Sequence, residues 1–469
     1  MKITIEKRKT SFVFICLCVT LCFNSCQSEF LDAKPSTDIV QPSSLQDLYR
    51  LLDNERIINM TPALPQASAD EYFIHNEAVL NALFSATQRN AYTWEIDLFG
   101  GEVDIADWNQ PYQAIFYANS VLDALELMHE RESTDGQRIR GWALFIRAYA
   151  MYSLVSNFAP LYDESTSSED LGIPIQLKSS IDELVQRATV ADTYQQIFSD
   201  LNEAEPLIWT DIPTMNRNRP SQVAVHALRA RIYLSMRQYE SAEYYADKCW
   251  SMYSDLIDYN TIDTVTVTPF TYNSAEIIYH TRQVNVYSTT TGYGDIMAGY
   301  IGVDTSLIDL YSTDDLRLPI FFETGNNGYQ TVKRGYVGGG SYPFTGLSTG
   351  EVLLVKAECA ARRGDVDVAQ ECLNELLVNR YVSGSFAPFV LPNQQDALKM
   401  VLYERRKELV WRGLRWSDIK RLNKEGAAIT IERRLEGQTF SLPPNSPKYI
   451  FPIPDDEIAL SGIAQNDRF

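Results

Sequence analysis

The stretch Arg140-Gly-Trp-Ala-Leu-Phe-Ile-Arg-Ala-Tyr-Ala-Met-Tyr-Ser-Leu-Val-Ser-Asn-Phe-Ala-Pro-Leu-Tyr162 decides the fold, because its small and aliphatic residues recur at helical spacing. The pattern predicts a helix over residues 137–157, which Pro160 prevents from continuing. One face of this helix carries Ala143, Ile146, Ala150 and Leu154, with Arg140 and Arg147 beside it. A preceding amphipathic stretch predicts a partner helix over 111–130, with Pro111 in its first turn. The short polar turn between them makes the two helices a hairpin.

The same helix-pair pattern returns twice along the chain. The predicted helices of these later pairs span residues 192–208, 223–236, 239–250, 351–363 and 366–380. Small residues such as Ala227 and Ala357 let the paired helices approach, and repeated pairs stack because no single pair buries its own apolar face. The segments 230–242 and 355–365 resemble tetratricopeptide repeats. Because the spacing between units is irregular, we expect a mostly helical scaffold interrupted by insertions.

Two regions break the helical pattern and are rich in aromatic residues, about 61–110 and 256–348. Within the second region, residues 264–268 and 276–279 have the composition of short strands. The helical scaffold then spans about 111–255 and 349–422. We therefore expect any ligand surface to be built from the two irregular regions.

The N-terminus has the layout of a lipoprotein signal. A charged stretch, Lys2 to Lys9, precedes an apolar run over 12–23, and the small polar pair Asn24-Ser25 leads to Cys26. The apolar run is shorter than the roughly 20 residues that a membrane-spanning helix needs. We expect residues 1–25 to be removed, Cys26 to carry the lipid, and 26–469 to form a single domain. The alternative is an ordinary secretory signal with a chance cysteine near its cleavage site.

Composition narrows the function classes further. The formal net charge of −20 argues against nucleic acid as a partner, because a protein that neutralises phosphates must offer a basic face. Beyond the signal, the cysteines are Cys249, Cys359 and Cys372, and all lie inside helical patterns. An odd number of cysteines in helices indicates buried thiols rather than a disulfide framework. The four histidines show no metal-ligand spacing with them.

A series of motifs then resembles the SusD/RagB family of outer-membrane lipoproteins, in the family's order and over nearly the whole chain. The motifs are Phe30-Leu31-Asp32 with Pro35, the stretch 140–162, Gly172-Ile-Pro-Ile175, Arg219-Pro-Ser221, Glu404-Arg-Arg-Lys-Glu-Leu-Val-Trp-Arg-Gly-Leu-Arg-Trp-Ser-Asp-Ile-Lys-Arg421, Tyr449-Ile-Phe-Pro-Ile-Pro454, Glu457 and Gln465-Asn466. One departure is Arg412, which precedes Gly413 where the family usually has Glu. This change concerns the scaffold more than the ligand.

The resemblance implies a mostly α, SusD-like fold with four tetratricopeptide-like helix pairs plus irregular loop and short-strand insertions. It also implies a lipid-anchored protein on the outer face of the cell outer membrane, on top of a SusC-like TonB-dependent transporter. Members of the family capture oligosaccharides, or peptides in the RagB branch, and deliver them to that transporter. We expect the same role here.

Binding needs no catalytic group, and the sequence contains no nucleophile elbow, phosphate-binding loop or His-Glu-x-x-His motif. We therefore expect no enzyme, no cofactor and no metal site; a structural cation could bind but no residue set places it. The predicted ligand-binding residues are Trp94, Tyr72, Phe99, Asp70, Asp97, Tyr293 and Tyr329. The apolar face of a sugar ring packs on an aromatic side chain, and Trp94 is the predicted platform because ligand sites of the family resemble its placement in the early irregular region. The alternative is that Trp94 fills the core beneath its loop.

Other residues of the C-terminal motif are expected to be structural. Trp411 and Trp416 should pack in the core, and Arg405, Arg406, Arg412 and Arg415 should pair with acids between helices. Asn119 should hold a hydrogen bond within a helix pair. The leading interpretation is therefore a surface glycan-binding lipoprotein, followed by a peptide-binding one, a repeat scaffold that docks partners, and lastly an enzyme.

Overall fold

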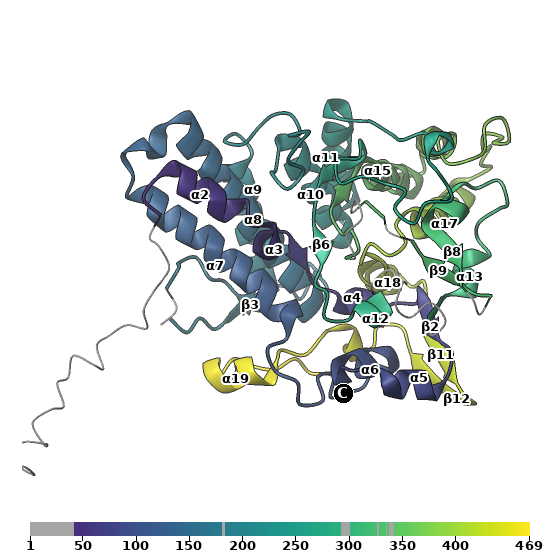
Figure 1. The fold of residues 1–469 in the computed structure, drawn as a ribbon, viewed down its shortest axis with the longest axis horizontal. Coiled ribbons are helices and arrows are strands. Elements are labelled where there is room, and N and C mark those ends of the chain that lie inside the picture. The colour runs from purple at the N-terminus through teal and green to yellow at the C-terminus, as the bar shows by residue number, and fades with distance from the viewer. Residues whose placement is uncertain (1–41, 181–182, 292–300, 326–327, 334, 337–341) are drawn as a thin grey trace, which may run out of the picture. The chain divides into compact units, whose positions relative to one another are not determined.

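The structure is a computed structural model that describes residues 42–180, 183–291, 301–325, 328–333, 335–336 and 342–469 (Figure 1). By its contacts the chain divides into Met1–Ser43 and Ser44–Phe469, and the account below concerns the second unit. The predicted signal segment and Cys26 lie outside the described residues. In the part of the chain that is described, no helix combines the length and apolarity that crossing a membrane requires.

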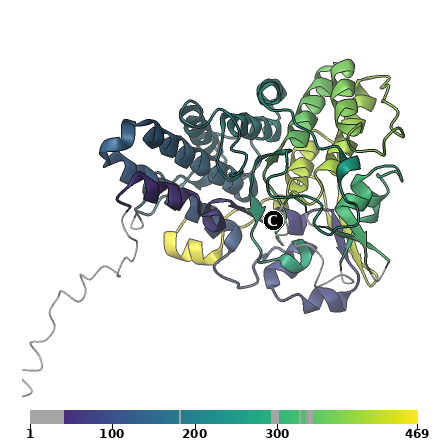
Figure 2. The same ribbon diagram turned by 45° about the horizontal axis from the view of Figure 1, so that its top comes forward.

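The larger unit is built on long helices that pack in consecutive antiparallel pairs. They are α7 (Ala106–Glu126), α8 (Thr134–Phe158), α9 (Val190–Ala204), α10 (Gln222–Ser235), α11 (Tyr239–Met252), α15 (Thr349–Arg363), α16 (Val366–Leu377), α17 (Gln394–Glu408) and α18 (Arg415–Lys424). Contacts run from α7 to α8 to α9, and from α10 through α11 and α15 to α16 and α17. In Figure 2 the teal helices lie between the blue pair and the green helices, so the pairs form a continuous layer.

Shorter elements surround this layer. The short helices are α2 (Leu45–Leu52), α3 (Glu55–Ile58), α4 (Leu64–Ser68), α5 (Glu77–Ala82), α6 (Ala86–Thr93), α12 (Ser288–Thr291), α13 (Thr305–Ile308), α14 (Arg317–Phe321) and α19 (Asp455–Ser461), with 3-10 turns at His129–Glu132, Tyr259–Thr261 and Pro447–Tyr449. The strands form two-stranded sheets: β1 (Met60–Thr61) with β6 (Arg282–Gln283), β2 (Tyr72–Ile74) with β7 (Ile301–Val303), β3 (Leu171–Pro174) with β4 (Arg187–Thr189), β5 (Ile277–Tyr279) with β10 (Leu347–Ser348), β8 (Phe322–Thr324) with β9 (Gln330–Val332), and β11 (Ile431–Leu435) with β12 (Gln438–Leu442). The β1–β6 pair is parallel and the others are antiparallel.

The predicted helix pairs are confirmed, with shifts of a few residues at their ends. The α7–α8 hairpin closes through the Ser133 side chain, which caps α8 by accepting the Gly136 N–H. Gly141 sits where α8 meets the end of α9, and a Cβ there would lie 2.7 Å from Ile208 Cγ2. The small residue in the opening motif therefore allows the close approach of these two helices.

Two local predictions are wrong. Helix α7 begins at Ala106, so Pro111 lies more than one turn inside it; the additional turn forms because it buries Trp108 against Tyr112 and Phe158. Residues 264–268 form no strand. Val265 and Val267 are both exposed there, so the segment has no face to bury and no neighbour to pair with among the described strands. The predicted strand at 276–279 is confirmed as β5.

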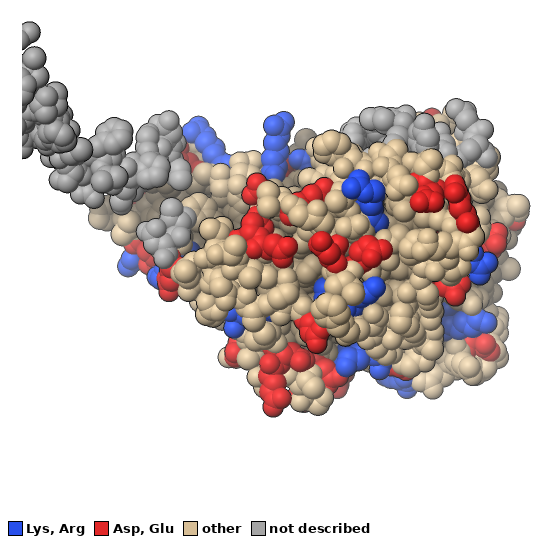
Figure 3. Space-filling model, turned by 90° about the horizontal axis from the view of Figure 1, so that it is seen from below, with Lys and Arg blue, Asp and Glu red and all other residues tan. Residues whose placement is uncertain are grey.

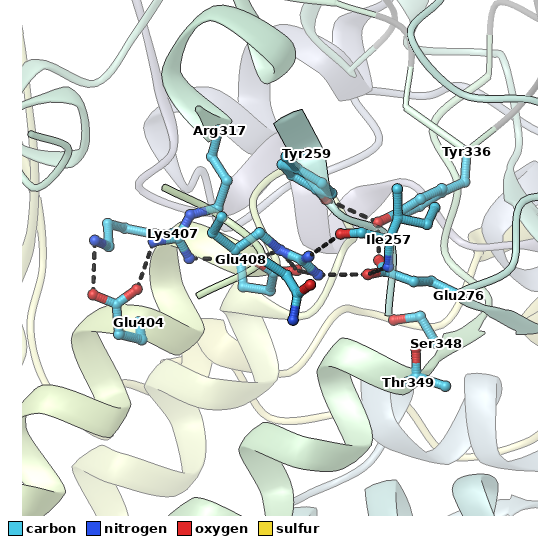
Figure 4. Close-up of polar contacts among 12 residues, drawn as sticks. Ile257, Tyr259, Glu276, Arg317, Tyr336, Ser348, Thr349, Glu404, Lys407 and Glu408 are labelled. Carbon is cyan, nitrogen blue, oxygen red and sulfur yellow. Dashed lines mark hydrogen bonds and ion pairs between the residues drawn. The ribbon is translucent and has the colours of Figure 1, made fainter. Parts of the chain in front are cut away.

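A network of buried charges lies at the centre of the C-terminal half (Figure 4). Arg317 is fully buried and donates to Asp315 at 2.7 Å, to Glu404 at 2.7 Å and to Glu408 at 3.2 Å. Lys407 lies 2.7 Å from Glu404 and 3.2 Å from Asp315. Burial alone would lower the pKa of Arg317, but the carboxylates of Glu404 and Asp315 raise it well above its usual value. Residues of α14 and α17 are thereby locked together.

Arg380 extends the network toward the irregular region. Its guanidinium donates to Glu408 at 2.8 Å, to Glu276 at 2.7 Å and to the Ile257 carbonyl at 3.0 Å, and it lies 4.0 Å from the Tyr259 ring centroid. Glu276 also accepts the hydroxyl of Tyr336. The network therefore ties the end of α16 and helix α17 to the segment before β5.

Arg317→Met should destabilise the protein strongly, because it leaves Asp315, Glu404 and Glu408 buried with fewer cations. Breaking a buried charge pair from one side costs about 3–5 kcal/mol, and we expect a matching fall in the free energy of unfolding measured by denaturant titration. Arg434→Met is the matched control: Arg434 pairs with Glu432 on an exposed strand face, with 78% and 52% of the two side chains accessible. Its loss should change stability by less than about 0.5 kcal/mol. Equal effects would contradict the structural role of the network.

Candidate functional site

The predicted platform, Trp94, lies inside the protein rather than on its surface. Only 3% of the residue is exposed, and its indole N–H donates to the Ser68 carbonyl at 3.0 Å. Trp94, Tyr72 and Tyr92 surround the guanidinium of Arg433, with ring centroids 4.7, 4.9 and 4.1 Å from its carbon. In this structure the faces of Trp94 and Tyr72, which the sequence predicts as ligand residues, pack against a cation from β11.

The other predicted ligand residues of the first irregular region, Phe99, Asp70 and Asp97, lie in different environments. Phe99, also predicted as a ligand residue, is buried in the main core. Asp70 is bound to Arg415 by two hydrogen bonds of 2.8 Å and lies 3.5 Å from Arg406. Burial would raise the pKa of Asp70, but Arg415 lowers it far below its usual value, so this carboxylate is committed to the scaffold. Asp97 is exposed and accepts the Gly100 N–H at 2.9 Å.

An aromatic cluster does reach the surface nearby, and it consists of Phe73, His75 and Tyr329. The Phe73 ring meets the Tyr329 ring edge-on at 5.1 Å and the His75 ring edge-on at 5.0 Å. The His75 and Tyr329 rings lie 4.7 Å apart at an angle of 39°. Tyr329 is 41% exposed. The three rings present a continuous, partly open aromatic surface.

Strand alternation places this cluster. Along β2, Tyr72 and Ile74 point into the core, so Phe73 and His75 point to the other side. Phe73 pairs with Gly302 of β7, where a Cβ would come within 2.6 Å of the Phe73 ring and 3.3 Å of the Tyr329 Cβ. Glycine at that position therefore leaves room for the Phe73 ring to pack against β7.

Tyr329 comes from the turn between β8 and β9. Its carbonyl accepts the Gly325 N–H at 2.8 Å, which fixes the base of that turn. The sequence placed Tyr329 in a ligand region, and the structure brings it to the surface beside β2. Phe73 and His75 were missed, although the alternating run Tyr72-Phe73-Ile74-His75 could have signalled them. Tyr293 lies in 292–300, outside the described residues.

The electrostatics of the cluster favour an uncharged ligand. Partial burial lowers the pKa of His75, which keeps its imidazole neutral at neutral pH. Beneath β2, Glu71 is buried and receives the Trp411 N–H at 3.2 Å. Burial raises the pKa of Glu71 to about 7. Within the described residues, no group of His, Cys, Asp and Glu could hold a metal ion. The arrangement offers ring faces and neutral hydrogen-bonding groups.

The structure confirms the core packing and the ion pairs predicted for the C-terminal motif. Trp411 and Trp416 are buried in the core. Arg405 pairs with Asp418 at 2.9 Å, Arg412 lies 3.8 Å from Glu351 and packs on the Phe344 ring, and Arg406 and Arg415 both meet Asp70. Asn119 donates to the Gln176 and Lys178 carbonyls and accepts from Arg147. Cys249, Cys359 and Cys372 are buried free thiols.

The face of the molecule seen in Figure 3 mixes acidic and basic side chains, with acidic groups forming a band across its middle. No continuous basic stripe crosses this face among the residues described. This face agrees with the net charge of −20 and offers no track for a phosphate backbone.

Comparison with known proteins identifies the family. Residues 29–234 match a family described as starch-binding and associating with the outer membrane, and residues 324–468 match the SusD family. SusD family proteins are non-catalytic binding proteins. No sequence among curated proteins matches the chain.

Solved structures share the fold. A SusD superfamily protein of Bacteroides thetaiotaomicron is 19% identical with a TM-score of 0.72, over 91% of this chain and 100% of that one. A Bacteroides vulgatus protein described as sugar binding is 22% identical with a TM-score of 0.71, over 91% and 99%. A SusD-like carbohydrate binding protein of Bacteroides vulgatus is 20% identical with a TM-score of 0.66, over 89% and 97%. The chain therefore belongs to the SusD/RagB family and has its mostly helical, SusD-like fold.

Proposed function

We propose that this protein is a cell-surface lipoprotein that captures an oligosaccharide and delivers it to a partner TonB-dependent outer-membrane transporter. The family description names starch binding and the outer membrane, and two of the similar structures are described as sugar or carbohydrate binding. The observation in this chain that carries the proposal is the partly exposed cluster of Phe73, His75 and Tyr329. It occupies the irregular regions in which the sequence predicts the ligand surface.

The cluster has the properties that a sugar requires. One face of a pyranose ring carries C–H groups, which pack on an aromatic ring, and its edge carries hydroxyls, which need hydrogen-bond partners. The Tyr329 ring is buttressed by Phe73 and His75, so little conformational freedom is lost when a ligand packs on it. The Tyr329 hydroxyl and the neutral imidazole can meet ligand hydroxyls. Tyr293 and Asp97 remain proposed ligand-binding residues.

The proposed anchor is a lipid on Cys26. One acyl chain binds a membrane only marginally, so stable anchoring needs a multiply acylated cysteine. The peptide-binding alternative keeps the same anchor and surface but replaces the sugar by an apolar side chain. A ligand screen separates the two.

Tyr329→Ala should weaken binding of the cognate glycan at least about tenfold, which is about 1.4 kcal/mol, because it removes the exposed ring of the cluster. The measurement is affinity electrophoresis of the purified protein against plant, microbial and host polysaccharides, followed by calorimetry on the hit, with casein-derived peptides alongside. Tyr244→Ala is the control, because Tyr244 is a comparably exposed tyrosine, at 53%, on helix α11.

Unchanged affinity in Tyr329→Ala would refute the proposed surface, and binding to peptides alone would refute the glycan. Trp94→Ala provides a contrast. We expect it to lower stability by about 3–5 kcal/mol, as large-to-small core changes do, because it opens a cavity beside Arg433.

Cys26→Ser should abolish lipid attachment. In cells grown with labelled palmitate, the wild-type protein should carry label and sediment with membranes, and the variant should do neither. Cys22→Ser is the matched control, because Cys22 lies within the apolar run and should be removed with the signal. Label that persists in Cys26→Ser, or a wild-type protein released without label, would support the ordinary secretory signal instead.

A further inference from the structure

A groove separate from the aromatic cluster lies between helix α18, the segment after α8 and the 3-10 turn Pro447–Tyr449 (α18 in Figure 1). Its volume is about 340 Å³, within the range of small-ligand sites. Apolar walls come from Leu161, Pro447 and Ile450, and polar groups come from Asp170, Lys420, Lys424 and Asn445. The groove thus combines apolar surface with a few convergent polar groups.

Lys420 is the unusual residue of this groove. It is only 6% exposed, and its ammonium donates one hydrogen bond, to the Ser156 carbonyl at 2.7 Å. An ammonium carries three N–H donors, and among the described residues no carboxylate lies within 4 Å of it. Burial lowers the pKa of Lys420 to about 8. The groove is therefore lined by a buried cation without an anionic partner.

Arg421, the next residue of the same helix, is a buried cation that does have carboxylate partners. Arg421 is 1% exposed and meets Glu358 at 2.8 Å through one nitrogen and Asp418 at 2.8 Å through another. Buried charges are normally paired in this way, because an isolated one is expensive to desolvate. Lys420 lacks such a partner although the helix holds several ion pairs.

The other charged groups around Lys420 are already engaged. Lys424 lies 3.3 Å from Asp163, and Arg237 lies 3.7 Å from the same carboxylate. Asp170 lines the groove and accepts the Thr166 hydroxyl at 2.6 Å. Burial raises the pKa of the Tyr449 hydroxyl, and the Tyr449 side chain also lines the groove. Lys420 is thus the cation of this groove that is available to an incoming anion.

We propose that this groove binds a small polyhydroxy acid, with the ligand carboxylate against Lys420 and its hydroxyls along Asp170 and Asn445. A simple anion such as phosphate fits less well, because it lacks the row of hydroxyls that could meet Asp170 and Asn445. A neutral sugar fits less well, because it leaves the Lys420 ammonium unpaired. The proposal is independent of the aromatic cluster, which is built from other elements.

The protonation of Lys420 gives the site a pH dependence. The pKa in the folded protein, about 8, lies below the usual value near 10.5. The charged lysine therefore destabilises the fold below about pH 8, and this penalty disappears as the pH rises from about 8 to about 10.5. An acid ligand requires the charged form, so its affinity should fall about tenfold between pH 7 and pH 9, in line with the protonated fraction of a group of pKa about 8.

The test is calorimetric titration of the purified protein with D-glucuronate at pH 7 and pH 9, with D-glucose as the neutral match and N-acetylglycine as a carboxylate without a sugar ring. We expect glucuronate to bind at least about tenfold more tightly than glucose at pH 7 and to lose this advantage at pH 9. Lys420→Met keeps the aliphatic stem and should abolish both the preference and its pH dependence. Lys399→Met changes an exposed lysine of α17 and should alter neither.

The possible outcomes decide the proposal. Equal binding of glucose and glucuronate, or a preference that survives in Lys420→Met, would overturn the role of the ammonium. N-acetylglycine binding at least as tightly as glucuronate would overturn the assignment to a sugar acid. The melting temperature is the second readout. Lys420→Met should melt at or above the wild-type temperature at pH 7, because it removes an unpaired buried charge, whereas a much lower temperature would show that the ammonium serves the fold.

Discussion

The pairing of buried arginines with carboxylates is the constraint on which the rest of this structure depends. Arg147 meets Asp200 between α8 and α9, Arg231 meets Glu351 between α10 and α15, and Arg421 meets Glu358 between α18 and α15. Such pairs add little net stability compared with apolar packing. If two helices meet in the wrong register, however, a buried charge is left without a partner, which is strongly destabilising. They therefore fix which helix faces meet, and they hold the irregular segments to the helical layer.

The same constraint explains why the early aromatic residues lie inside. Arg433 enters the core from β11, and among the described residues no carboxylate forms an ion pair with it. Its charge is met instead by the carbonyls of Ala69 and Tyr92 and by the ring faces around it. The aromatic residues whose sequence pattern suggests a sugar platform instead pack their ring faces against the Arg433 guanidinium. The ring that reaches the surface is Tyr329, and the neighbouring strand pair places Phe73 edge-on behind it.

The helical scaffold could be predicted from sequence because its signal is local. Small and aliphatic residues at helical spacing and a proline stop define α8, and tetratricopeptide-like segments mark the later pairs. The site could be predicted only as a region. Whether Trp94 faces a ligand or Arg433 depends on a strand far along the chain, and periodicity carries no information about that contact. The strand predicted at residues 264–268 was wrong for a related reason, because a strand-like composition does not tell whether a partner strand lies beside the segment.

Arg412 and Lys420 illustrate the difference between a buried cation whose contacts lie within the protein and one that can still bind a ligand. Arg412 replaces the acid usual in the family, yet it is engaged: it donates to the Gly346 carbonyl at 2.9 Å and packs on the Phe344 ring. Lys420 has one carbonyl and no ring or carboxylate among its described contacts. Arg412 and Arg433 each have carbonyl and ring partners, whereas replacing Lys420 with an apolar residue of similar size would raise the stability of the fold. An ammonium that is kept beside a groove of ligand size therefore indicates that the groove binds an anion. Burial of Lys420 alone, without the groove, would indicate only a structural role.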